Sequence, residues 1–86
     1  MNINELIKKV KYKLESRINI QDIKVEDKSF LHKNHKGQVE GKFHLKIIIK
    51  SEELKKLNKI ESTKKIYNIL DHELKEHIHS IQILLS

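Results

Sequence analysis

The fold follows from residues 43–50, which read Phe43-His44-Leu45-Lys46-Ile47-Ile48-Ile49-Lys50. Every odd-numbered residue in this stretch is apolar, and the even-numbered positions hold one histidine, two lysines and one isoleucine. Alternation with a period of two is typical of a strand with one buried face. The sequence therefore predicts a strand here, with its apolar face packed against helices.

Upstream of this strand the sequence predicts one helix and one shorter strand. Apolar residues recur at helical spacing from the start of the chain, at Ile3, Leu6, Ile7, Val10 and Leu14. This pattern predicts an amphipathic helix of about three to four turns, and Asn2 followed by Glu5 approaches the spacing of a capping box. Ile23 and Val25 alternate with polar neighbours and predict a short strand. The polar residues 27–42 hold both glycines and predict a long loop, which in a compact domain is usually functional.

Downstream, the pattern predicts a helix and a last strand. Ser51 is expected to be the N-cap of a short turn around Leu54 and Leu57. A second long helix is expected from about Ser62, burying Ile66, Ile69, Leu70 and Leu74. The segment from Ile78 to Leu85 predicts a final strand in which His79, Ile81, Ile83 and Leu85 share one face.

These elements predict a single α/β (α+β) domain with helices on one face of a three-stranded mixed sheet. Their order is helix, strand, strand, short turn, helix, strand, which is like that of bacterial-type KH domains. The connection between the second and third strands is long enough for a right-handed parallel crossover. At 86 residues the chain is too short for a second domain or a deep substrate cavity.

Composition limits the chemistry. There is no cysteine, so any metal or cluster ligand from this chain is a histidine or a carboxylate. The formal charge is +6, but Arg17 is the only arginine. Arginine is the residue favoured for bidentate phosphate recognition, so the charge argues only weakly for nucleic acid, and a compositional bias toward lysine explains it equally well.

We expect a protein of a reducing compartment, the cytoplasm, that does not associate with membranes. The N-terminus lacks the cationic start and apolar stretch of a signal peptide. The longest aliphatic run, Ile47 to Ile49, is too short to span a bilayer.

Six histidines are the only unusual functional groups: His32, His35, His44, His72, His77 and His79. If His77 and His79 both lie in the last strand, they point the same way and can share a ligand. Spacing alone leaves two interpretations open, a metal site and solvated surface side chains. No P-loop, dinucleotide or nucleophile pattern is present, so we expect no enzyme activity.

Several stretches together resemble the BolA family. Residues 27–32 (DKSFLH) are similar to the family's D-E-S-x-x-H, residues 44–51 (HLKIIIKS) to its H-F-x-V-x-x-V-S strand, residues 65–70 (KIYNIL) to the start of its second long helix, and residues 78–81 (IHSI) to its V-H-A-L strand. The resemblance covers nearly the whole chain. It implies one KH-like domain over residues 1–86.

The resemblance also implies a function. BolA proteins pair with monothiol glutaredoxins and share a [2Fe-2S] cluster, in assembly, trafficking or iron sensing. The family's ligand in the last strand matches His79, and its loop ligand matches His32, with His35 close enough to compete. Glutathione and a cysteine of the glutaredoxin supply the other ligands, and the free protein is expected to be a monomer that forms a heterodimer.

The chain departs from the family at positions that bear on nucleic acid. The R-H-R segment before the second long helix is here Ser62-Thr63-Lys64, Lys56 stands where many members have glycine, and Leu45 replaces the strand phenylalanine. Such arginines are natural phosphate contacts. A transcriptional regulator that binds nucleic acid through the KH-like fold is therefore the alternative rather than the leading hypothesis.

Overall fold

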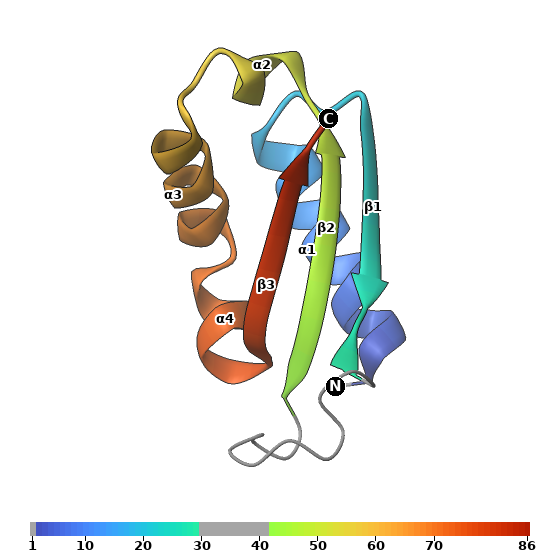
Figure 1. Cartoon of the computed structure of the whole chain (residues 1–86). Coiled ribbons are helices and arrows are strands. Elements are labelled where there is room, and N and C mark those ends of the chain that lie inside the picture. The colour runs from blue at the N-terminus through green and yellow to red at the C-terminus, as the bar shows by residue number, and fades with distance from the viewer. Residues whose placement is uncertain (1, 30–41) are drawn as a thin grey trace.

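The computed structural model describes residues 2–29 and 42–86, which form a three-stranded sheet and four helices (Figure 1). In chain order the elements are α1 (Ile3–Arg17), β1 (Asp22–Asp27), β2 (Phe43–Lys50), α2 (Glu52–Lys55), α3 (Lys59–Ile69), α4 (Asp71–Glu76) and β3 (Ile78–Leu85). The central strand, β2, pairs antiparallel with β1 and parallel with β3. The mixed sheet and the order of elements confirm the expected fold class.

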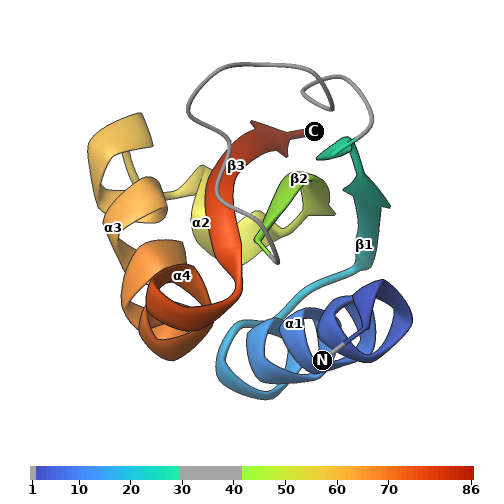
Figure 2. The same cartoon turned by 90° about the horizontal axis from the view of Figure 1, so that it is seen from below.

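The core lies between one face of the sheet and the helices. Viewed along the strands, α1 and the α3–α4 segment lie on the same side of the sheet (Figure 2). The buried apolar side chains of α1 are Leu6, Val10 and Leu14, and those of β2 are Leu45, Ile47 and Ile49. These are six of the nine positions predicted by the two periodicities, and the other three, Ile3, Ile7 and Phe43, are partly buried. Each such side chain stabilises the fold by roughly 1.5–3 kcal/mol when fully buried.

Hydrogen bonds at the helix starts confirm two predicted caps. The side chain of Asn2 accepts from the backbone N–H of Glu5 at 2.9 Å, and its amide donates to the Glu5 carboxylate at 3.2 Å. Ser51 accepts from the N–H of Leu54 at 3.2 Å and donates to the carbonyl of Asn19 at 2.8 Å. Both caps satisfy backbone donors that have no partner within the helix.

The second long helix differs from the prediction. It begins at Lys59 rather than near Ser62, because Asn58 caps it by accepting from the N–H of Glu61 at 2.8 Å. It is also interrupted at Leu70, after which α4 turns the chain toward β3 (Figure 1). None of the helices in the described ranges has the length and apolar content needed to cross a membrane.

A bulge near the start of β3 changes where His79 lies. Phe43 is opposite Ile78, whereas His44 is opposite Ser80, so β3 has one extra residue at this point. Beyond the bulge Ile81 is partly buried, whereas His79 is exposed. The expectation that His79 shares a face with Ile81 and the following alternate residues is therefore wrong, because the extra residue breaks the period of two.

Candidate functional site

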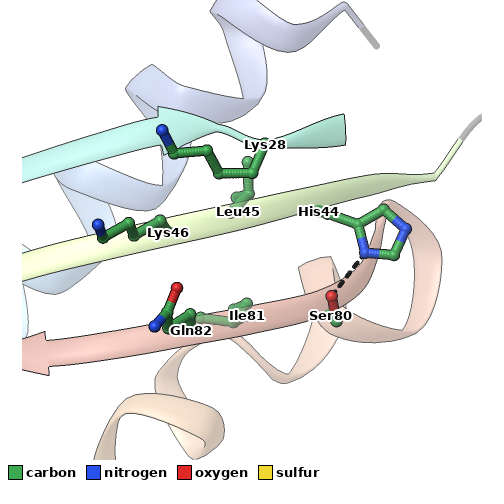
Figure 3. A pocket seen from close by; sticks show the side chains of 7 residues that line it. All are labelled: Lys28, His44, Leu45, Lys46, Ser80, Ile81 and Gln82. Atoms are coloured by element: carbon green, nitrogen blue, oxygen red, sulfur yellow. Dashed lines mark hydrogen bonds between the residues drawn. The ribbon is translucent and has the colours of Figure 1, made fainter. Parts of the chain in front are cut away.

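His44 is fixed at the start of β2 by the two residues that follow β1 and by a residue of β3. Its backbone N–H donates to Oγ of Ser29 at 3.0 Å, and its carbonyl accepts from the N–H of Lys28 at 2.7 Å. Its ring nitrogen Nδ1 is hydrogen-bonded to Oγ of Ser80 on β3 at 2.6 Å (Figure 3). The residue is only 6% exposed. The His44 ring is thus a rigid, buried part of this end of the sheet.

His79, the residue predicted to be a ligand, lies against this ring. The centroids of the two imidazoles are 4.9 Å apart, with 61° between the ring planes, so one ring meets the other edge-on. Unlike His44, His79 is exposed. Imidazole nitrogen is the commonest protein ligand for metals and replaces thiolate in some [2Fe-2S] centres. The donor chemistry of His79 and its accessibility therefore fit an iron–sulfur cluster.

The predicted loop ligands, His32 and His35, lie outside the described residues. The described residues on either side of them, Ser29 and Lys42, are both at the His79 end of the sheet. Ser29 is hydrogen-bonded to His44, and Lys42 directly precedes Phe43, which pairs with the first residue of β3. The described residues that flank the two histidines in sequence are therefore at the same end of the sheet as His79.

The other two histidines belong to α4 and its end. His77 is the C-cap of α4, its N–H donating to the carbonyl of Glu73 at 2.8 Å, and its ring centroid is 6.2 Å from that of His72. Because His77 is not in the strand, the condition for pairing it with His79 is not met. Within residues 2–29 and 42–86, no three His, Asp or Glu side chains gather into a group able to hold a metal ion.

A pocket of about 350 Å³ lies beside His44 (Figure 3). It includes His44 and Lys46, which alternate along β2 with the core residues Leu45 and Ile47 and so lie on the sheet face turned away from α1 and α3. Its lining residues are Lys28, His44, Leu45, Lys46, Ser80, Ile81 and Gln82. Lys28 is also 3.8 Å from the carboxylate of Glu26 on β1. The pocket was not predictable from the sequence, because it is formed by residues of β2 and β3 and by Lys28, which follows β1, and the sequence does not specify how these segments pair.

A second groove, of about 390 Å³, lies between β3 and the α2–α3 segment. Its lining residues are Leu54, Lys55, Leu57, Lys59, Ser62, Thr63, Ile83, Leu84 and Leu85. Two lysines and two hydroxyls thus accompany an apolar surface. Sequence analysis did not predict this groove either, because it placed the start of the helix too late to include Lys59.

A buried ion pair positions α4, the element that leads directly into β3. Glu73 on α4 is completely buried, and Nζ of Lys13 on α1 is 2.8 Å from each of its carboxylate oxygens. Burial raises the pKa of Glu73, but hydrogen bonds from Lys13 and from its own backbone, with the charges of Lys13 and Lys9, lower the pKa further than burial raises it. The ion pair between Glu73 and Lys13 therefore joins α4 to α1, and both helices lie on the same side of the sheet.

The chain is similar to proteins of one family. A family profile described as "BolA-like protein" matches residues 14–86. The "DNA-binding transcriptional regulator BolA" of Haemophilus influenzae is 27% identical over 85 residues, which cover 99% of this chain and 77% of that protein. The BolA domain of SufE1 from Arabidopsis thaliana is 25% identical with a TM-score of 0.81, covering 99% of this chain and 94% of that one. BolA1 from the same plant is 23% identical with a TM-score of 0.78, covering 93% and 88%.

Proposed function

The chain belongs to the BolA-like protein family, and from this premise we propose that it is a non-enzymatic partner of a monothiol glutaredoxin in the assembly, trafficking or sensing of a shared [2Fe-2S] cluster. His79 carries the proposal. It is an exposed imidazole at a bulge of an edge strand, backed by the buried ring of His44. A partner's surface reaches such a side chain without rearranging the core.

In this proposal His79 is the first ligand and His32 the second, with His35 as the competing residue. The chain contains no cysteine, so its ligands to iron are nitrogen or carboxylate oxygen. The glutaredoxin's cysteine and glutathione provide the thiolates. Histidine in place of thiolate raises the potential of a [2Fe-2S] cluster. Because the thiolate ligands of the partner and of glutathione persist in a reducing compartment, the proposed location is the cytoplasm. The free protein is proposed to be a monomer that forms a heterodimer with the glutaredoxin.

The test is to mix the protein with a monothiol glutaredoxin, iron, sulfide and glutathione, and to record visible absorption and circular dichroism. We expect the wild type to change the spectrum of the glutaredoxin-bound cluster and His79→Ala to leave that spectrum unchanged. The matched control is His72→Ala, which removes another exposed histidine, on α4. The proposal is wrong if the wild type has no effect, or if His79→Ala behaves like the wild type.

Substitution of the loop histidines then assigns the second ligand. His32→Ala is expected to shift the spectrum of the mixed cluster, because a different donor must occupy the vacated coordination position. His35→Ala is expected to leave it nearly unchanged. The opposite result assigns the second position to His35, and no effect of either substitution, or of both together, excludes a ligand from this loop.

A second candidate function is nucleic-acid binding, favoured by the groove beside β3. Lys55 and Lys59 line it together with Thr63, and lysine and hydroxyl side chains are groups that contact phosphate. The Haemophilus relative is named as a DNA-binding regulator. Titration with duplexes of different sequence at two salt concentrations tests this function. Loss of both lysines is expected to reduce the salt dependence by about two phosphate contacts. Binding without sequence preference, unaffected by the two substitutions, contradicts the groove as the site.

A further inference from the structure

We infer that His44 is a positioning residue for His79, acting through the hydroxyl of Ser80. The inference rests on the proposed function, because it concerns how the proposed ligand is oriented. His44 itself is 6% exposed and its Nδ1 is bonded to Ser80. A cluster held at a partner's surface therefore contacts His79 and not His44.

The location of His44 relative to the bulge supports this role. His44 is opposite Ser80, the residue that follows His79. The 2.6 Å hydrogen bond between Nδ1 of His44 and Oγ of Ser80 therefore joins β2 to β3 directly after the bulged residue, His79. A bulge changes the direction of a side chain and leaves its extra residue outside the ladder. Without a fixed neighbour, the strand on either side of His79 is free to change its local geometry.

The His44 ring also limits the conformations of His79 directly. The two rings meet edge-on with their centroids 4.9 Å apart. Because the backbone of His44 is held by Lys28 and Ser29, its ring is a fixed surface against which the His79 ring rests. Groups outside the coordination shell orient metal ligands, and where such a group is hydrogen-bonded to the ligand its loss typically costs 10- to 100-fold in metal affinity.

Two substitutions test the inference, with one control. His44→Phe keeps an aromatic ring beside His79 but removes the ring nitrogens, and Ser80→Ala removes the hydroxyl at an exposed position. The control is Gln82→Ala, two residues further along β3, exposed and lining the same pocket. His44→Asn is the conservative variant, since its amide retains a group able to bond the Ser80 hydroxyl.

The first measurement uses the free protein and needs no cluster. Three-bond couplings from the backbone nitrogen and carbonyl carbon to Cγ of His79 report its χ1 rotamer populations in solution. We expect one dominant rotamer in the wild type, in Gln82→Ala and in His44→Asn, and averaged couplings in His44→Phe and Ser80→Ala. The double variant is expected to be no more averaged than either single variant, because both changes remove the same hydrogen bond.

The second measurement uses the complex with the glutaredoxin. A chelator is expected to remove the cluster about 10- to 100-fold faster from Ser80→Ala than from Gln82→Ala. Unchanged His79 couplings in Ser80→Ala overturn the inference. If the couplings change in His44→Phe but not in Ser80→Ala, the effect comes from the size of the ring and the inference is likewise overturned. If His44→Phe fails to fold, Ser80→Ala decides. If the wild type binds no cluster, the proposed function fails, while the couplings in the free protein still decide the positioning role.

Discussion

Replacing Lys13 by methionine removes the cation that makes the closest contacts with the buried carboxylate of Glu73. Lys13 lies 2.8 Å from both oxygens, and Lys9 is 3.6 Å from one of them. Breaking a buried ion pair costs about 3–5 kcal/mol, and breaking an exposed one costs about 0–1 kcal/mol. The Lys13 side chain is 32% exposed and Lys9 remains. We therefore expect Lys13→Met to lower the free energy of unfolding by about 2–3 kcal/mol.

Urea and thermal unfolding followed by circular dichroism measure this loss, which corresponds to a decrease of roughly 10–20 °C in Tm for a domain of this size. The matched control is Lys9→Met, one helical turn earlier, where the side chain is 40% exposed and more distant. We expect the control to cost about 1 kcal/mol or less. Equal losses in the two variants, or a loss below about 0.5 kcal/mol in Lys13→Met, would refute the assignment of the ion pair.

The dependence on pH provides an independent check of the same ion pair. The native pKa of Glu73 is below its ordinary value of 4.5. A carboxyl whose pKa is lower in the native state stabilises the fold above its unfolded pKa, and this stability is lost as the pH falls through the native pKa. In Lys13→Met the pKa-lowering hydrogen bond and charge of Lys13 are lost, while burial still raises the pKa of Glu73, so we expect this pKa to be higher than in the wild type. The difference in stability between wild type and variant is therefore expected to shrink as the solution is acidified below about pH 4.5.

Three further predictions concern other parts of the fold. Ile47→Ala is expected to cost about 2–5 kcal/mol, because Ile47 is fully buried, whereas Ile48→Ala, half-buried on the other face, costs about 1 kcal/mol; urea unfolding of the pair measures the difference. Asn58→Ala removes the cap of α3 and is expected to cost about 1 kcal/mol by the same assay, and no loss would contradict the cap. The hydrogen bond from Lys65 lowers the pKa of Glu53. Glu53→Gln is therefore expected to lower the stability at neutral pH and to make the loss of stability below about pH 4.5 smaller than in the wild type. Identical acid unfolding curves for the wild type and the variant would contradict this.

The elements with regular periodicity were predictable from the sequence. β2 combines alternation with β-branched residues at Ile47 and Ile49, so local preference and burial agree. α1 shows both a capping pair and an apolar stripe. The start of α3 was also predictable, since Asn58 and Glu61 repeat the spacing of Asn2 and Glu5. The prediction placed this start later because it relied on apolar periodicity alone.

Two features of the structure were not predictable. The interruption of the helix at Leu70 has no glycine or proline to mark it. The second feature depends on the pairing of distant segments. The bulge at His79 depends on which residues of β2 lie opposite the start of β3, and the local sequence of neither strand specifies this register. For the same reason the sequence suggested His79 as a ligand only by family resemblance, and gave no indication that His44 lies against it.

The parallel pairing of β2 with β3 has a consequence for the order in which the site forms and is lost. The connection between them runs through residues 51–77 and three helices, so β3 docks only after a long, non-local closure, which is a slow step in folding. Among the residues that the structure describes, β3 is an edge strand paired only with β2, and we expect its opening to need less than global unfolding. Such an opening carries His79 away from His44 while β1 and β2 stay paired. Under the proposed function, slow hydrogen exchange along β3 therefore marks the state in which His79 is held in place for the partner.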